Sequence, residues 1–258
     1  PHSEDPHERL GAVVARPHAH ALLVDQLRAD AAERWMPATR ALAERGVRFS
    51  EMRAVAPWTY PSVTSLFSGL YPQQHGADAN QQGTRLTTIS ADVPLLPRTL
   101  RAAGYHTAAF VTNPFFHEWN QPFAGSFAKF DASFIGDQGP TRGHGDKVWT
   151  KRMYADSVNA AVRQYFDGHA LGAPEFVYVH YIDVHGRKES AERWREAPFE
   201  PSYEAATRYV DAKIAELYGL FRARYGDNLL FLVTSDHGQD LDDDLGDGFP
   251  RRAREPCA

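Results

Sequence analysis

Residues 203 to 234 read YEAATRYVDAKIAELYGLFRARYGDNLLFLVT, and this stretch decides the fold class. Its first part, from about Tyr203 to Tyr225, is expected to be a long helix. The second part, Leu229 to Thr234, is a short and nearly all apolar strand. Such strands are typical of parallel sheets whose two faces are both covered by helices.

The same helix and strand alternation recurs upstream, after a first apolar strand. We expect that strand at Ala19 to Val24, followed by a helix from about Pro37 to Arg45 that Gly46 closes. A helix at Leu95 to Ala103 then precedes a strand at His106 to Thr112. A helix from about Lys147 to Phe166 precedes a strand at Phe176 to Ile182. The pattern predicts an α/β fold with a central, mostly parallel sheet and helices on both faces.

The chain has 258 residues, 43% of them hydrophobic, which is enough for one substantial core. We expect a loose lead-in at 1–18, one catalytic domain at 19–240 and an irregular tail at 241–258. The stretch from Asn113 to Asp146 shows no clear period, and an active-site wall and a plain surface excursion both fit it.

Bulk properties exclude several classes of function. A formal charge of -5 gives no electrostatic basis for a nucleic-acid partner. No apolar run approaches the roughly 20 residues of a transmembrane helix, so we expect no transmembrane segment. The single cysteine, Cys257, excludes an intrachain disulfide and a cysteine zinc site.

Acidic residues follow three of the expected strands. Asp25 closes the first, Asp183 closes Phe176 to Ile182, and Asp236 follows Leu229 to Thr234; His185 and His237 lie beside two of them. One such aspartate is usually an ordinary loop residue. Carboxyl ends of parallel strands share one edge, however, and carboxylates gathered there repel one another unless a cation lies among them. The arrangement predicts a divalent metal site.

A second feature lies at residues 58 to 66, which read WTYPSVTSL. Pro61 suits the first turn of a helix and Gly69 suits its end, so Thr59 is expected beside a helix N-terminus. Unpaired amides and the helix dipole favour a sulfate or phosphate group there. The alternative is that Thr59 or Ser62 only caps the helix.

These residues resemble a known family. The segments 59–62 (TYPS), 68–72 (SGLYP) and 75–76 (HG) resemble the nucleophile signature of sulfatases and their relatives in the alkaline phosphatase superfamily. The segments 25–30 (DQLRAD), 180–186 (HYIDVHG) and 234–238 (TSDHG) resemble the first metal-binding strand end, the central histidine segment and the last metal pair of that family. The four motifs occur in the family's order.

The resemblance implies an alkaline-phosphatase-like fold and a set of roles. One divalent ion (Ca, Mg, Mn or Zn) would be bound by Asp25, Thr59, Asp236 and His237. Thr59 would also be the nucleophile and form a covalent intermediate, and His185 would protonate the leaving oxygen. The substrate would be a small-molecule or a glycan or lipid ester of phosphate or sulfate, contacted by His75, Asp183 and His185.

The sequence departs from the family pattern at several positions. Sulfatases carry at the Thr59 position a cysteine or serine that is converted to formylglycine, and threonine cannot be converted in this way; relatives with threonine cleave or transfer phosphoesters. Val63 replaces the arginine of the signature, and Gln26 replaces a second acidic ligand.

The family also continues beyond its last metal pair with a further strand and a C-terminal subdomain, so we expect a C-terminally truncated member. The acidic run from Asp240 does not fit a calcium loop, because Leu245 and Arg251 occupy the positions of the required glycine and glutamate. The alternative function is a truncated or degenerate sulfatase-like protein that keeps the fold and binds metal or anions without catalysis.

Overall fold

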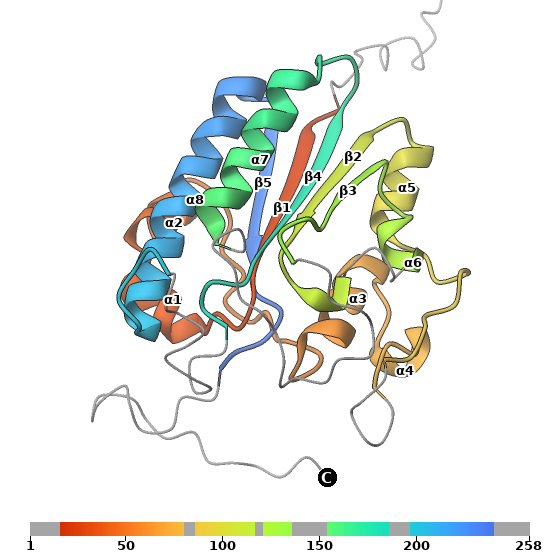
Figure 1. Cartoon of the computed structure of the whole chain (residues 1–258), viewed down its shortest axis with the longest axis horizontal. Coiled ribbons are helices and arrows are strands. Elements are labelled where there is room, and N and C mark those ends of the chain that lie inside the picture. The colour runs from red at the N-terminus through yellow and green to blue at the C-terminus, as the bar shows by residue number, and fades with distance from the viewer. Residues whose placement is uncertain (1–15, 80–85, 117–120, 136–153, 186–196, 240–258) are drawn as a thin grey trace, which may run out of the picture.

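A computed structural model describes residues 16–79, 86–116, 121–135, 154–185 and 197–239. Five strands form one sheet in the order β3-β2-β4-β1-β5, and all neighbouring strands are parallel (Figure 1). The strands are β1 (His18–Val24), β2 (His106–Val111), β3 (Lys129–Asp131), β4 (Glu175–Tyr181) and β5 (Leu229–Thr234). The predicted α/β class and parallel sheet are confirmed.

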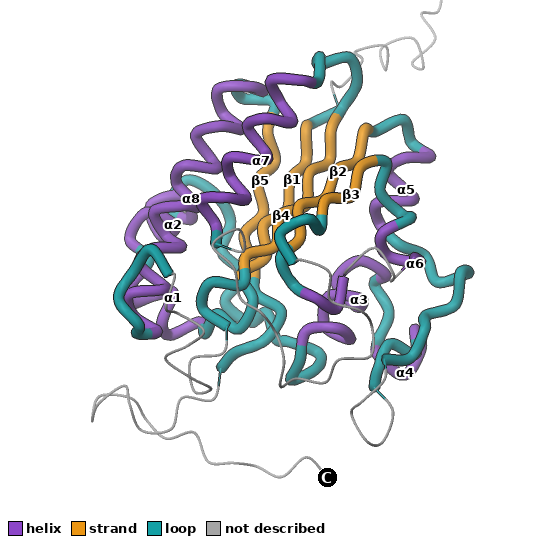
Figure 2. The backbone as a smooth tube through the Cα atoms, in the orientation of Figure 1, coloured by secondary structure: helices purple, strands orange, loops and turns teal. Residues whose placement is uncertain are grey.

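Helices cover both faces of the sheet, as Figure 2 shows. One face packs against α1 (Ala29–Trp35), α2 (Pro37–Ala43), α7 (Ala155–Gly168) and α8 (Tyr203–Tyr225). The other packs against α3 (Thr59–Ser68), α5 (Leu96–Ala102), the 3-10 turn η2 (Pro114–Phe116) and α6 (Gln121–Ala124). The short helix α4 (Pro72–His75) follows α3.

The alternation of side chains along β4 explains why this strand is apolar throughout. Val177 and Val179 belong to the core on the α7 and α8 side, whereas Phe176 and Tyr178 belong to the core on the α3 side. Every residue of β4 is buried. A strand covered on both faces has no solvent-facing positions at which polar residues would be favoured.

The strand register aligns the carboxyl ends of β1, β4 and β5. Val24 at the end of β1 pairs with Tyr181 at the end of β4, and Leu23 pairs with Thr234 at the end of β5. The backbone amide of Asp25 extends this ladder by donating to the Tyr181 carbonyl over 2.9 Å. The residues that follow the strands therefore share one rim.

Most expected elements agree with the structure to within a few residues, but several short elements, α4, η2 and α6 among them, were missed. Both α8 and β5 have the expected bounds, and α3 ends at Gly69, whose φ of 69° is the left-handed conformation that glycine adopts readily. Helix α1 was not expected, and neither was β3, which lies in the stretch from 113 to 146. Helix α7 begins at Ala155, and residues 147–153 of the expected helix lie outside the described residues.

The domain ends stay as predictions, because 1–15 and 240–258 also lie outside the described residues; β1 itself begins at His18. Among the helices that the structure describes, none combines the length and the apolar character needed to span a membrane.

Candidate active site

Three elements bring Thr59 together with two of the predicted metal ligands. Thr59 is the first residue of α3, Asp25 follows β1, and His237 follows β5. The Thr59 Oγ1 atom lies 3.3 Å from Asp25 Oδ2, 3.5 Å from Asp25 Oδ1 and 3.3 Å from His237 Nε2. All three residues are buried, so these groups meet away from bulk water.

This geometry excludes the capping alternative for α3. The N-cap residue is Trp58, and no side chain caps the helix there. The Ser62 hydroxyl donates to the Ala56 carbonyl over 2.9 Å, and the Thr59 hydroxyl points to Asp25. Thr59 is therefore directed into the rim and not onto its own helix.

Asp236 completes the cluster. Its Oδ1 accepts from the backbone amides of Gln26, over 3.1 Å, and of His237, over 2.9 Å. The Gln26 residue adopts a left-handed φ of 60°, which aims its amide at Asp236. The other oxygen, Oδ2, lies 3.4 Å from His237 Nε2 and has no hydrogen-bond partner among the described residues.

The two carboxylates differ in pKa because their surroundings differ. Burial opposes ionisation of Asp25, but the charge of His185 and the hydrogen bond with His180 outweigh it and lower the pKa below its usual range. Burial, followed by the negative charge of Asp25, raises the pKa of Asp236 to about 6. The second carboxylate therefore resists ionisation beside the first.

The donor set fits a divalent cation. One ligand atom each of Asp25, Asp236 and His237 lies within 4.8 Å of the others. Two carboxylates, an imidazole and the adjacent Thr59 hydroxyl are oxygen and nitrogen donors of the kind that such cations prefer. A cation would also offset the repulsion between the carboxylates and engage the unpartnered Asp236 Oδ2.

Two further residues reach this cluster that the sequence did not identify. Asn113, just beyond β2, donates from Nδ2 to Asp25 Oδ2 over 2.5 Å. His180, on β4, has its Nε2 atom 3.3 Å from the same oxygen. Asn113 stands at the carboxyl end of a strand, as Asp25 and Asp236 do, and this position is the signal that could have identified it.

The predicted substrate residues lie in three different surroundings. His185 is half-buried beyond β4, and its charge acts on Asp25, so it belongs to the electrostatic environment of the cluster. Asp183 instead accepts a 3.0 Å hydrogen bond from the Ala155 amide at the start of α7. Burial is the main cause that raises the pKa of Asp183 to about 7.

His75 links secondary-structure elements. Its Nδ1 atom accepts from the Ala77 amide over 3.0 Å, and its Nε2 atom lies 2.8 Å from the Ser65 hydroxyl of α3. The ring is buried, and burial lowers its pKa. The substrate contacts expected of His75 and Asp183 stay predictions, and the contacts described here give both residues a part in holding helices in place.

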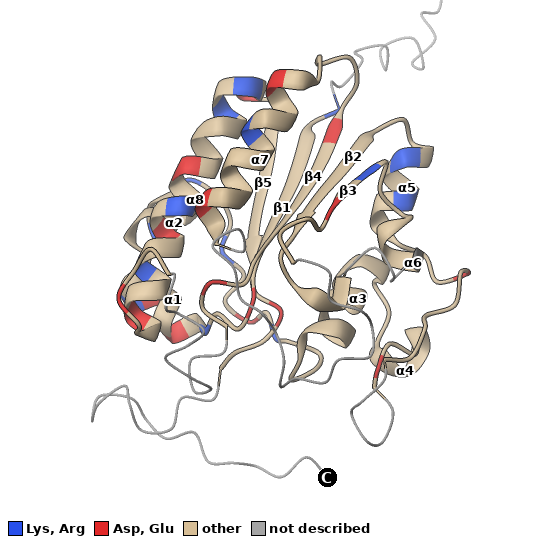
Figure 3. Cartoon of the chain, viewed as in Figure 1, with Lys and Arg blue, Asp and Glu red and all other residues tan. Residues whose placement is uncertain are grey.

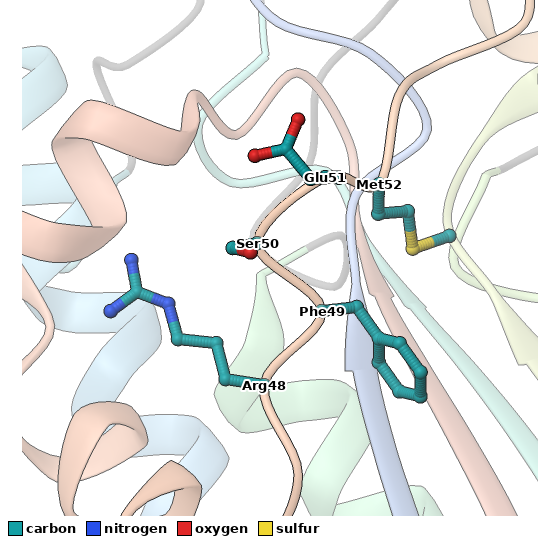
Figure 4. Close-up of a pocket in the computed structure, with 5 residues that line it drawn as sticks. All are labelled: Arg48, Phe49, Ser50, Glu51 and Met52. Carbon is teal, nitrogen blue, oxygen red and sulfur yellow. The ribbon is translucent and has the colours of Figure 1, made fainter.

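Acidic residues lie near the rim of the sheet, whereas the pocket described here lies elsewhere. Figure 3 shows acidic residues on the loops beyond the lower ends of the central strands. A pocket lined by residues 48–52 lies elsewhere, on the segment that runs past β5 (Figure 4). None of the candidate site residues lines this pocket. The candidate site is identified by its converging side chains.

The cluster of carboxylates, imidazole and hydroxyl lies at the carboxyl edge of a parallel α/β sheet, where proteins of this architecture bind their ligands. The sulfatase family model matches residues 23–255. The chain belongs to the sulfatase family. No curated protein matches it.

Solved structures with the same fold include proteins of several activities. A Bacteroides thetaiotaomicron protein described for the metabolism of multiple glycosaminoglycans gives a TM-score of 0.65 at 17% identity, covering 88% of this chain and 64% of that chain. The lipoteichoic acid synthase LtaP from Listeria monocytogenes gives 0.60 at 15% identity, with 90% and 59% covered. The phosphonate monoester hydrolase of Agrobacterium radiobacter gives 0.59 at 15% identity, with 87% and 63% covered.

The chain thus spans less than two thirds of the length of these structures. At such low identities the likeness concerns the fold, which is that of the alkaline phosphatase superfamily.

Proposed function

We propose that the chain is a metal-dependent hydrolase or transferase of phosphate or sulfate esters that acts through a covalent intermediate on Thr59. The observation that carries the proposal is the position of Thr59 Oγ1, within 3.5 Å of both Asp25 carboxylate oxygens and His237 Nε2. A buried hydroxyl beside two carboxylate oxygens and an imidazole supports a nucleophilic role for Thr59.

The reaction follows from these positions. Thr59 Oγ1 attacks the phosphorus or sulfur atom, while the proton that this hydroxyl donates toward Asp25 is released to water. The bond from that atom to the ester oxygen breaks, and His185 gives the leaving oxygen its proton. Water or another acceptor then attacks the same atom and gives its proton to His185, which is thereby restored. The bond to Thr59 Oγ1 breaks, and this oxygen takes back a proton from water.

A divalent cation held by Asp25, Asp236 and His237 would lower the pKa of the Thr59 hydroxyl and offset the negative charge that develops on the transferred group. The N-terminal turn of α3 acts in the same direction, since its amides and dipole favour an anion beside Thr59.

We favour phosphoesters as the substrate class. Threonine at position 59 cannot become the formylglycine of the usual sulfatases, so the hydroxyl itself must react. Val63, which replaces the signature arginine, is fully buried in the apolar core beside α3. Among the described residues, the cation donors and the terminus of α3 are the charge partners that we propose for the substrate anion, and Asp183 and His185 are the expected contacts from the central histidine segment.

The non-catalytic alternative has less support. A degenerate member would be free to lose its nucleophile or its ligands, yet Thr59, Asp25, Asp236 and His237 converge in the buried rim. Retention of all four donors in one place favours a working site.

The test is hydrolysis of para-nitrophenyl phosphate, its phosphodiester analogue and para-nitrophenyl sulfate, with and without added Mn²⁺, Ca²⁺, Mg²⁺ or Zn²⁺. We expect metal-dependent phosphoester hydrolysis that Thr59→Ala lowers by at least about 1000-fold, because the variant lacks the nucleophile. Thr59→Ser keeps a hydroxyl and should retain measurable activity.

Thr64→Ala is the matched control, since Thr64 is also buried in α3 but donates its hydroxyl to the Tyr60 carbonyl over 2.7 Å. This variant should stay within about threefold of the unaltered chain. Equal turnover by the unaltered chain and Thr59→Ala with every metal would reject the proposal.

A further inference from the structure

The side chain of Asn113 is held at both ends. Its Nδ2 donates to Asp25 Oδ2 over 2.5 Å, and its Oδ1 accepts from the Phe115 backbone amide over 2.9 Å. The amide orientation follows from these partners, because a carboxylate can only accept and a backbone amide can only donate. Asn113 is fully buried, so no water competes for these bonds.

His180 approaches the same carboxylate oxygen from β4. Its Nε2 atom is 3.3 Å from Asp25 Oδ2, and its Nδ1 atom is 3.1 Å from the Tyr178 hydroxyl. A neutral ring satisfies both contacts, with Nε2–H donating to the carboxylate and Nδ1 accepting from the tyrosine. Thr112 ties the two strands together by donating to the His180 carbonyl over 2.7 Å.

The two oxygens of Asp25 have different surroundings. Oδ2 receives the donors of Asn113 and His180, whereas Oδ1 lies 3.9 Å from His237 Nε2 on the side of the cation donors. The Thr59 hydroxyl lies near both, 3.3 Å from Oδ2 and 3.5 Å from Oδ1. A carboxylate that is bonded through one oxygen cannot rotate freely. Outer hydrogen bonds of this kind orient metal ligands in general.

We infer that Asn113 and His180 are positioning residues that hold Asp25 by Oδ2 and so orient this carboxylate, with Oδ1 toward the other cation donors. The inference rests on the proposed function, since it assigns the residues that pre-arrange the same metal site. Asn113 also ties the carboxylate to the chain beyond β2, because its Oδ1 fixes the backbone at Phe115.

The experiment titrates Mn²⁺ into the unaltered chain and into Asn113→Ala by isothermal calorimetry, without substrate. We expect the dissociation constant of Asn113→Ala to rise by about 10- to 100-fold, the usual effect of removing an outer partner of a metal ligand. A value within about threefold of the unaltered chain would overturn the inference.

Asn159→Ala is the matched control. Asn159 is another fully buried asparagine, and it lies in α7 on the opposite face of the sheet, where its amide donates to the Lys213 carbonyl over 3.0 Å. This variant should lose comparable stability in thermal unfolding but keep its Mn²⁺ affinity within threefold. An equal loss of affinity in both variants would mean a general loosening and would overturn the inference.

His180→Gln provides a second measurement with the same thresholds, and it replaces Asn113→Ala if that variant does not fold. The outcomes also separate the two proposals. An unaltered chain that binds no Mn²⁺ would reject the metal-dependent function and this inference together. Unchanged Mn²⁺ binding in folded Asn113→Ala would reject this inference alone and leave the proposed function standing.

Discussion

Asp236 lies in the candidate metal site, and its ionisation lowers the stability of the metal-free protein. Its pKa is about 6 in the folded chain, against 3.8 for an ordinary aspartate. The folded state therefore keeps this proton over a pH range in which the unfolded chain releases it. Stability gained from the protonated form is present below about pH 4 and is lost as the pH rises toward 6.

Asp236→Asn should stabilise the metal-free protein at pH 7.5. Asparagine keeps an Oδ1 acceptor for the amides of Gln26 and His237 but removes the buried negative charge beside Asp25. We expect a gain of about 2 kcal/mol, or roughly 4 to 8 °C in Tm, in thermal unfolding with a chelator present. The gain should shrink as the pH is lowered toward 4.

Asp92→Asn is the control, because Asp92 is exposed, and its Tm should change by less than about 1 °C. The same Asp236→Asn variant should no longer be stabilised by added Mn²⁺. A metal-free Tm that stays constant or falls would contradict the repulsion between the two carboxylates.

At the scale of elements, one helix is capped by another. The N-terminus of α2 has no capping side chain of its own, and Asp211 of α8 replaces it. Its carboxylate accepts from the backbone amides of Ala38, over 2.9 Å, and Thr39, over 2.8 Å. The contact joins α2 to α8, two helices that cover the same face of the sheet.

Asp211→Ala should lower the free energy of unfolding by about 1 to 3 kcal/mol, since it leaves two helix amides without acceptors. Urea unfolding monitored by circular dichroism measures the change. Glu204→Ala is the comparison on the same helix, because its ion pair with Arg208 is half exposed and should be worth less than about 0.5 kcal/mol. Equal losses in the two variants would refute the capping role.

The elements show which structure could be predicted from the sequence. Helix α8 has 23 residues and β5 is apolar, so length and pattern identified both. Helix α1 has only seven residues and no capping side chain, and β3 has three residues, so neither gave a periodic signal.

The site residues also fall into those that the sequence predicted and those that it did not. Asp25, Asp236 and His237 come just after apolar strands, which predicted their shared rim. Asn113 holds the same position after β2, but asparagine is common in loops, and a histidine inside a buried strand, such as His180, usually belongs to the core. Their role depends on the distance between β2, β4 and β1, which is a property of the folded sheet.

At the scale of the molecule, the protection of backbone amide hydrogens against exchange with solvent should follow the order of the strands in the sheet. Strands β1 and β4 have neighbours on both edges, whereas β5 has one neighbour in the described part of the chain, and its Leu230 and Leu232 are 47% and 44% exposed. We expect amides of β1 and β4 to exchange at least about tenfold more slowly than those of β5, because they open only in larger unfolding events.

Hydrogen exchange followed by mass spectrometry measures this difference on peptides that cover each strand. Peptides from α8 serve as an internal reference, since this helix packs along the core over its whole length. Protection of β5 equal to that of β4 would mean that the edge is covered in solution.

The position of β1 between β4 and β5 has a consequence for the time at which the sheet can form. This strand is made first, yet its partners β4 and β5 begin at Glu175 and Leu229. At about 5 to 20 residues per second, the ribosome needs on the order of 10 to 40 s to deliver β5 after β1. During that interval the edge of β1 that pairs with β5 has no strand partner. The candidate cation site cannot form until Asp236 and His237 have been synthesised. The candidate site can therefore assemble only after β5 and the residues that follow it have been synthesised.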